Sequence, residues 1–150
     1  MDNTKKFADA AQYIVISMGE EQFGIDIRYI DNIVKMQHIT RVPNVASYIK
    51  GVINLRGEVL PVMSLRLKMG LEADVTTKNT RIIILRLEQY GMIGIIVDEV
   101  KEVLTLEEDC IEKVVNDSKD EKEGFVFAVG KCEGGLVSLL DLNVVAFEKE

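Results

Sequence analysis

Short runs of apolar residues, separated by turns rich in glycine and acidic residues, follow one another along the whole chain. The runs are rich in Ile and Val, whose branched side chains favour β-strands over helices. Their lengths are also typical of strands. We therefore predict strands at the following positions: Tyr13–Met18, Gln22–Ile25, Ile33–Met36, Val52–Leu55, Val59–Met63, Arg81–Leu87, Met92–Val97, Val100–Leu106, Phe125–Val129 and Leu136–Leu140.

Tight turns connect several of these predicted strands. They lie at Gly19–Glu21, Arg56–Glu58 and Glu88–Gly91. Such short links favour antiparallel hairpins, because a parallel crossover needs about a dozen residues or more.

Helices are predicted to be few and short. They are expected at Val45–Lys50, Leu65–Gly70 and Asp141–Lys149, with Asp141 as the N-cap of the last one. Two polar segments, Leu71–Asn79 and Asn116–Glu123, are predicted to be surface loops.

The strand pattern occurs twice along the chain, as an internal repeat would produce. Gly24–Ile27 corresponds to Gly94–Val97, and Ile30 corresponds to Val100. The repeat predicts a mostly β protein made of two small barrels, at approximately residues 13–70 and 80–147. A barrel of about 65 residues is marginally stable alone. We therefore expect a single domain over residues 1–150, with a seam between the barrels that could hold a ligand or a partner helix.

The composition is that of a soluble globular protein, with 47% hydrophobic and 29% charged residues. Lys and Arg number 18 against 25 Asp and Glu, so the basic patch that nucleic acid or an anionic membrane requires is not expected. No apolar run is long enough for a signal peptide or a membrane span, which predicts a cytoplasmic protein without membrane insertion. Cys110 and Cys132 form no Cys-x-x-Cys motif and suit a reducing compartment.

Residues for catalysis and metal binding are scarce. His38 is the only histidine, and no Gly-x-Ser-x-Gly nucleophile motif is present. The two cysteines lack the paired spacing of zinc ligands. Gly124–Cys132 differs from a phosphate-binding loop, because apolar residues stand where such a loop needs exposed backbone amides. We therefore predict no enzyme, no metal and no cofactor.

The most informative stretch runs from Pro43 to Val62, where a predicted strand ends in Arg56 and a glycine turn reverses the chain. Arg56 follows apolar residues, so its guanidinium group must find carbonyls, a carboxylate or a partner. The sequence leaves two interpretations open: Arg56 ties the loop to the barrel, or it belongs to a partner-binding surface.

Three segments together resemble the CheW family of chemotaxis coupling proteins: Phe23–Ile27, Tyr48–Gly57 and Gly94–Val100. The resemblance extends over roughly Gln12 to Val145. It implies two intertwined, five-stranded SH3-like barrels with a few short helices and no catalysis. It also implies a scaffold that couples methyl-accepting chemotaxis receptors to the CheA histidine kinase, at receptor arrays on the inner face of the membrane.

The resemblance further implies two sets of site residues. The receptor tip, a helical hairpin, is expected at Ile30, Ile33, Val34, Arg56, Val100 and Val103. The regulatory domain of CheA is expected, barrel against barrel, at Arg56, Gly57, Glu58, Val59 and Leu60. A further contact for ring assembly is expected at Glu121–Phe127. From the pattern alone, core packing is the commoner role of the apolar positions among these.

Two positions depart from the family's usual pattern. Asn32 stands where many members have an acidic residue, which leaves Asp31 as the neighbouring carboxylate for Arg56. Ser64 stands where Asp is common and is still a competent N-cap.

Two other functions remain open. One is an adaptor of the same kind in another histidine-kinase pathway, such as motility or surface sensing. The other is a small β-barrel that binds a low-molecular-weight ligand in the seam. An open, elongated seam would indicate a helix groove, whereas a closed pocket with convergent polar groups would indicate a ligand site.

Overall fold

The computed structural model describes residues 10–113, 123–132 and 135–146. Within these ranges the protein is mostly β, as predicted, with short α-helices α2 (Leu65–Lys68) and α3 (Leu142–Ala146). Single 3-10 turns are η1 (Ile27–Tyr29), η2 (Glu108–Cys110) and η3 (Glu123–Phe125). The strands are β1 (Ala11–Met18), β2 (Glu21–Asp26), β3 (Ile30–Lys35), β4 (Ile49–Leu55), β5 (Glu58–Ser64), β6 (Arg81–Leu87), β7 (Gly91–Val97), β8 (Glu99–Leu106), β9 (Ile111–Lys113), β10 (Val126–Cys132) and β11 (Gly135–Leu140).

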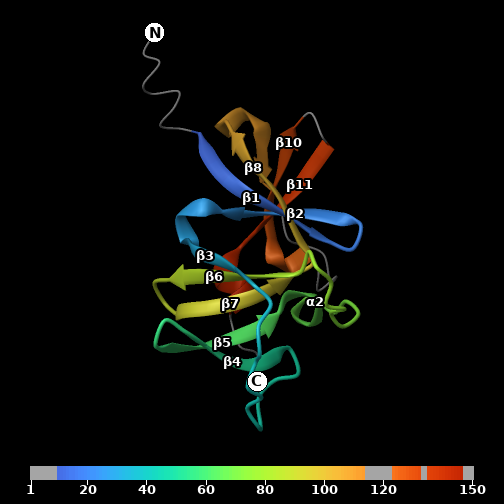
Figure 1. Ribbon diagram of the computed structural model, residues 1–150. Helices are drawn as coiled ribbons and strands as arrows, with labels where there is room; N and C mark the ends of the chain where they lie inside the picture. Colours follow the sequence, from blue (N-terminus) through green and yellow to red (C-terminus); the bar gives the residue numbers. More distant parts are fainter. Residues whose placement is uncertain (1–9, 114–122, 133–134, 147–150) are drawn as a thin grey trace.

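The strands form two sheets, which lie one above the other in Figure 1. The upper sheet has six strands in the order β8-β1-β2-β11-β10-β9, and the lower sheet has five in the order β3-β6-β7-β5-β4. Most neighbouring strands are antiparallel, and one parallel pair occurs in each sheet, β2 with β11 and β5 with β7. Without the short strand β9, the two orders are equivalent strand by strand, which confirms the internal repeat.

The two halves of the chain exchange strands between the sheets. The first half supplies β1 and β2 to the six-stranded sheet and β3 to β5 to the five-stranded sheet. The second half supplies β6 and β7 to the five-stranded sheet and the remaining strands to the other. The division predicted from the repeat, with barrels at 13–70 and 80–147, therefore does not follow the sheets, because each segment contributes strands to both.

Glycine is required where the parallel strands meet. Gly24 on β2 pairs with Leu139 on β11, and the equivalent Gly94 on β7 pairs with Val62 on β5. A Cβ atom would lie 2.8 Å from a Leu139 methyl at the first position and 2.9 Å from an Ile82 methyl at the second. Both copies of the repeat thus place a glycine where neighbouring side chains close over the strand.

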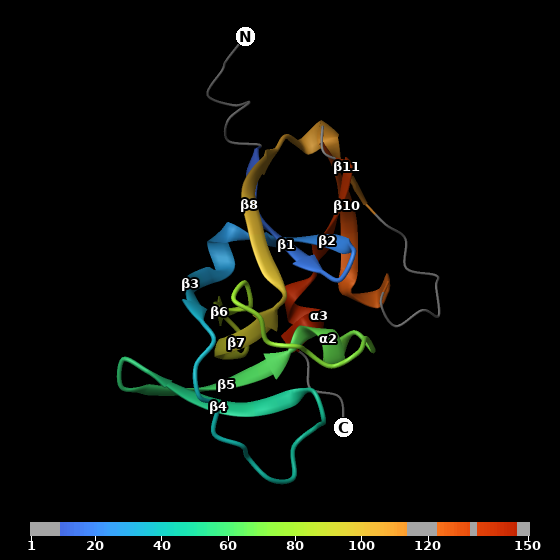
Figure 2. The same cartoon turned by 45° about the vertical axis from the view of Figure 1, so that its right-hand side comes forward.

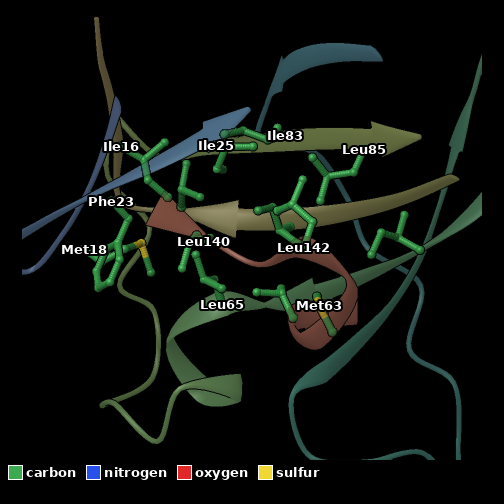
Figure 3. Close-up of a cluster of buried hydrophobic side chains, with 14 of the residues drawn as sticks. Ile16, Met18, Phe23, Ile25, Met63, Leu65, Ile83, Leu85, Leu140 and Leu142 are labelled. Carbon is green, nitrogen blue, oxygen red and sulfur yellow. The ribbon is translucent and has the colours of Figure 1, made fainter. Parts of the chain in front are cut away.

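Each sheet curls around its own apolar cluster, and a third cluster fills the space between the sheets, here called the joint (Figure 3). Along β6, Ile82 and Ile84 pack inside the five-stranded sheet, whereas Ile83 and Leu85 point into the joint. Among the described residues the joint holds 17 buried apolar side chains, against six in each of the other clusters. The two sheets therefore share their largest core, as expected of lobes too small to fold alone.

Two of the three predicted helices are confirmed, together with their caps. Ser64 Oγ accepts a hydrogen bond from the Leu67 N–H at 3.1 Å and caps α2. Asp141 Oδ1 accepts one from the Asn143 N–H at 3.1 Å and caps α3. Neither helix, nor any other in the described ranges, is long and apolar enough to cross a membrane.

The helix predicted at Val45–Lys50 is wrong. This segment forms bends and a turn, and β4 already begins at Ile49. Asn44 has a left-handed φ of 61°, so the chain does not enter a helix there. Ile111–Lys113, which had no predicted strand, pairs with β10 as β9. The predicted loop at Asn116–Glu123 lies almost entirely outside the described residues.

Candidate functional site

The strands β3 and β8 are equivalent in the repeat, and each is the edge strand of its sheet at the joint. Figure 2 shows both on the side of the molecule away from β10. An edge strand has neighbours on one side only, which makes it available to a partner.

A β-bulge in each edge strand brings candidate receptor residues onto one face. Strict alternation would place Ile30 and Ile33 on opposite faces of β3. The register against β6 shifts between Ile30 and Asn32, so both isoleucines lie opposite residues of the joint cluster. An equivalent shift in β8 does the same for Val100 and Val103.

These four residues, Ile30, Ile33, Val100 and Val103, form what we call the rim of the joint. The first three are half-buried and pack against the joint cluster, whereas Val103 is 52% exposed. The joint itself is filled by the chain's own side chains, so the expectation of an open cleft running through the seam must be corrected. Along the edge strands, the rim is the part of the joint that a partner helix could contact.

Val34 does not belong to the rim. It pairs in register with Ile82 and packs against the cluster inside the five-stranded sheet, on the opposite face from Ile33. Asp31, the carboxylate considered for Arg56, instead forms an ion pair with Arg86 at 2.8 Å.

Arg56 occupies a strained position in the hairpin between β4 and β5. Leu55 pairs with Glu58, so Arg56 and Gly57 alone make the turn, with φ angles of 50° and 86°. Two positive φ angles define a type I′ turn, in which Asn and Gly are preferred and a long side chain is unfavourable. The Gly57 N–H donates to Asn54 Oδ1 at 3.1 Å and stabilises the turn.

The Arg56 side chain is exposed and makes no ion pair or hydrogen bond within the described residues. Its strained backbone therefore presents a free guanidinium group to solvent. Of the two interpretations left open by the sequence, the geometry favours a partner-facing arginine over one that ties the loop to the sheet.

The other candidate kinase residues differ sharply in exposure. Val59 is 67% exposed, whereas Leu60 is 2% exposed and packs inside the five-stranded sheet. Leu60 therefore cannot offer its side chain to a partner. The edge strand of this hairpin is β4, because β5 lies between β4 and β7. Of the region predicted for ring assembly, residues 123–127 are described, and the Phe127 side chain is 39% exposed.

Within the described ranges, no three His, Cys, Asp or Glu side chains come close enough together to hold a metal ion. His38 is exposed and outside every strand, and Cys110 and Cys132 are free thiols.

One end of the joint is closed by an ion pair, here called the clasp. Arg66 on α2 donates from Nε to Asp98 Oδ1 at 2.7 Å and from Nη2 to Oδ2 at 2.5 Å. The Gly19 N–H, in the turn between β1 and β2, also donates to Oδ2, at 2.8 Å. Because Gly19 lies in a turn of the six-stranded sheet and Arg66 lies on α2, which follows β5 of the other sheet, the clasp bridges the two sheets.

The clasp is partly shielded from water. The Arg66 and Asp98 side chains are 20% and 27% exposed. Hydrogen bonding from Arg66 lowers the pKa of Asp98 below its ordinary value, against the opposing effect of partial burial. Arg66 Nη1 also donates to the Glu72 carbonyl at 3.3 Å, and the Ser64 hydroxyl donates to the Asp74 carboxylate. The predicted surface loop after α2 is thereby held against this end.

The repeat defines an equivalent set of positions at the other end of the joint. Asn143 stands where the clasp has Arg66, two residues after the N-cap of its helix in both cases. Arg28 stands where the clasp has Asp98, four residues after the paired glycine of its strand. The residues that would close this end are therefore replaced.

A cleft of about 750 Å³ lies at this open end. Its lining comes from η1, the β6–β7 turn, β10 and the start of α3, and includes Arg28, Gln89, Phe127 and Asn143. Arg28 Nη2 and Nε donate to the two carboxylate oxygens of Asp26 at 2.8 and 3.1 Å. This pair lies within one segment and does not bridge the sheets.

Tyr13 also lines the cleft and is only 5% exposed. Burial raises the pKa of its phenol, and the nearby charge of Asp26 raises it further. Tyr13 and Asp26 are direct partners in the β1–β2 register, so their side chains share a face.

No local sequence pattern marks Arg66, Asp98 or Tyr13 as site residues. A signal was nevertheless present, because a position-by-position comparison of the two repeats sets Arg66 against Asn143 and Asp98 against Arg28. The exchange of strands between the sheets is what brings these positions together, and the repeat alone does not reveal that exchange.

The chain is similar to known proteins over nearly its full length. A family model described as the CheW-like domain matches residues 12–149. The chemotaxis protein CheW of Helicobacter pylori is 35% identical over 137 residues, which are 91% of this chain and 82% of that protein. CheW of Bacillus subtilis is 34% identical over 142 residues, 95% of this chain and 90% of that protein. The crystal structure of the scaffolding protein TtCheW from Thermoanaerobacter tengcongensis matches with a TM-score of 0.82 and 31% identity, covering 90% of this chain and 91% of that chain.

Proposed function

The chain belongs to the CheW-like family, and from this premise we propose that it is a scaffold that couples chemotaxis receptors to the CheA histidine kinase. The observation that carries the proposal is the family match, which includes every strand of both sheets. The candidate sites present exposed apolar side chains, such as Val59 and Val103, and an exposed arginine, Arg56, which suits contact with other proteins.

We assign the receptor contact to the rim. A helix can lay an apolar stripe against side chains contributed by two strands, and the rim offers two from β3 and two from β8. The Arg86–Asp31 pair and the Lys101–Glu99 pair, the latter at 3.8 Å, flank these residues with charge. An apolar centre with a polar border is the usual anatomy of a protein interface.

We assign the kinase contact to the hairpin of β4 and β5. Arg56 and Val59 supply an exposed guanidinium group and an exposed apolar side chain close together on this hairpin. Arginine is enriched among the residues that dominate binding energy. Leu60 supports the hairpin from inside the sheet and is left out of the proposed contact.

The two proposed contacts involve the same sheet. β3 and β4 are the two outer strands of the five-stranded sheet, so a receptor on the rim and a kinase on the hairpin would both contact this sheet. The receptor and the kinase would then be coupled if receptor binding at the rim favours the conformation of this sheet to which the kinase binds more tightly.

The proposal is tested by measuring the affinity of a receptor-tip fragment and of the CheA regulatory domain for two variants. Val103→Asp places a carboxylate in the apolar contact, where it loses its water without gaining a partner, and should weaken receptor binding by roughly tenfold or more. Kinase binding should stay unchanged. The fold should tolerate the change, since Val103 is 52% exposed.

Arg56→Gly is the second variant. It should weaken kinase binding by roughly tenfold and leave receptor binding unchanged. Glycine adopts the φ of 50° without strain, so this variant should be more stable than the parent chain by about 1 kcal/mol. A loss of binding therefore cannot be attributed to unfolding.

Val75→Asp is the matched control, because Val75 is an apolar side chain that is 80% exposed and lies outside both proposed surfaces. It should bind both partners as the parent chain does. Unchanged receptor affinity in Val103→Asp would refute the rim assignment, and unchanged kinase affinity in Arg56→Gly would refute the hairpin assignment. If the parent chain bound neither partner, the scaffold function itself would be refuted.

A further inference from the structure

The clasp shows that an end of the joint can accommodate an arginine side chain. At the closed end, a guanidinium group from α2 lies between the two sheets and meets a carboxylate and a backbone carbonyl. At the open end the strands and the short helix are equivalent, Arg28 lies in the 3-10 turn η1, and Asn143 replaces the arginine and is too short to occupy an equivalent volume. The cleft of about 750 Å³ lies where that side chain would be.

The charge of the cleft favours a cation. Three carboxylates line it, those of Asp26, Glu88 and Asp141, against the single guanidinium group of Arg28. Asp26 is already paired with Arg28, whereas Glu88 is exposed in the β6–β7 turn. An added cation would therefore meet an excess of negative charge.

The Tyr13 hydroxyl also reaches the cleft, where it has no partner among the described residues. Tyr13 is 5% exposed, and its hydroxyl makes no hydrogen bond to any residue in the described part of the chain. The hydroxyl of a buried tyrosine normally has a partner, and one that lacks a protein partner is satisfied by water or by a ligand. Because a phenol oxygen can accept a hydrogen bond as well as donate one, the Tyr13 hydroxyl is available to an occupant that carries N–H donors.

Aromatic rings complete the lining. Tyr29 is 41% exposed, and the Arg28 guanidinium carbon lies 5.7 Å from the centre of its ring. Phe127 lies in the same cleft, and its side chain is 39% exposed. A guanidinium group stacks favourably on such rings while it donates hydrogen bonds in its plane.

We propose that the open end of the joint binds an arginine side chain of a partner protein, held by the Tyr13 hydroxyl, the Glu88 carboxylate and the ring of Phe127. The partner's arginine would fill the open end in the way that Arg66, an arginine of the chain itself, fills the closed end. This contact lies outside the rim and the β4–β5 hairpin, and it does not depend on the function proposed for them.

The test is a titration of the isotope-labelled full chain with N-acetyl-arginine amide, followed by backbone amide shifts in nuclear magnetic resonance spectra. A single side chain should bind with a dissociation constant on the order of 1 mM. The shifts should be saturable and confined to η1, the β6–β7 turn and the start of α3. N-acetyl-citrulline amide has the same shape without the charge and should bind at least about fivefold more weakly.

Two variants locate the site. Tyr13→Phe removes only the hydroxyl, and Glu88→Gln removes only the charge, so each should weaken binding of the arginine probe by about threefold or more. Glu20→Gln changes the equivalent turn at the closed end and should leave binding unchanged. The spectra themselves show that each variant is folded, and Glu88→Gln alters an exposed side chain only.

Three results would overturn the proposal. They are the absence of saturable shifts, equal binding of the citrulline probe, and binding that persists unchanged in both cleft variants. Sedimentation velocity adds a fourth. A dimer of the chain that is lost in Glu88→Gln would make a second copy the occupant and exclude a separate partner protein.

Discussion

At one end of the joint Arg66 and Asp98 hold the two sheets together, whereas at the equivalent positions of the other end Asn143 and Arg28 leave a cleft. Both ends have a capped short helix and a glycine at the parallel contact, whereas Arg28 lies in the 3-10 turn η1 and Asp98 lies directly between β7 and β8. The side chains at the equivalent positions, and the turn that carries one of them, therefore distinguish the closed end from the open end.

The two ion pairs near these ends differ in what they join. Arg66 and Asp98 connect α2, which follows β5 of the five-stranded sheet, to the start of β8 in the six-stranded sheet, and Gly19 adds a hydrogen bond from the β1–β2 turn of that second sheet. Arg28 and Asp26 are two residues apart, and the Arg28 side chain is 74% exposed. A shielded pair that bridges two sheets stabilises the fold, whereas an exposed local pair contributes little.

The largest effect is expected from removing the carboxylate at the closed end. Asp98→Ala leaves the Arg66 guanidinium group, only 20% exposed, without its acceptor and should lower the free energy of unfolding by about 2 kcal/mol. Asp26→Ala is the matched change at the open end. It removes an acceptor of the Arg28 N–H and should cost about 1 kcal/mol, because Arg28 can be solvated instead.

Urea unfolding of the three proteins at pH 7 measures both values. If the two variants lost the same free energy of unfolding, the contact between the two sheets would add nothing to stability. The two ends would then differ in structure but not in their contribution to stability.

A smaller effect is expected in acid. The pKa of Asp98 is lowered in the folded state, so its stabilising contribution is present above the pKa of an unfolded aspartate, about 3.9. The contribution is lost as the pH falls through the lower, folded value. The stability difference between the parent chain and Asp98→Asn should therefore be constant from pH 7 to pH 5 and shrink below about pH 4.

The same comparison in an Arg66→Ala background is the control, because Arg66 is the main cause of the shift. There the pKa of Asp98 is no longer lowered by Arg66 and burial still raises it, so the stability difference between the chain that keeps Asp98 and the chain that also carries Asp98→Asn should no longer shrink below about pH 4. If the difference in the parent background also stayed constant down to about pH 3, the clasp would not be the origin of the acid sensitivity.

Much of the fold could be predicted from the sequence, since strand composition and tight turns are local properties. The repeat was also visible, because equivalent glycines and apolar positions recur in order. The exchange of strands was not visible. A repeat shows which strands are equivalent but not whether β3 packs with its own half or with the other, and a short connection such as η1 permits both.

The site residues show the same limit more sharply. Alternation along β3 predicts that Ile30 and Val34 share a face, and the bulge reverses this, so that Ile30 joins Ile33 instead. Bulges leave no clear mark in a single sequence. The left-handed Arg56 is likewise invisible in the sequence, since it occupies a turn position that normally takes Asn or Gly.

The smallest effect, and the most direct test of the contrast, comes from building the missing clasp. The double variant Arg28→Asp, Asn143→Arg places the acid and the arginine of the closed end at the equivalent positions of the open end. Arg28→Asp alone should destabilise slightly, since it sets a second acid beside Asp26, whereas Asn143→Arg alone should be nearly neutral, since the cleft has more carboxylates than cations. The melting temperature of the double variant should exceed the value expected from adding the two single shifts, because the new charges pair.

The double variant should also no longer bind the arginine probe, since its own arginine side chain fills the cleft. Two results together would contradict this expectation: melting shifts of the single variants that simply add, and unchanged binding of the arginine probe. They would show that an arginine and an acid at the equivalent positions are not sufficient to close the open end.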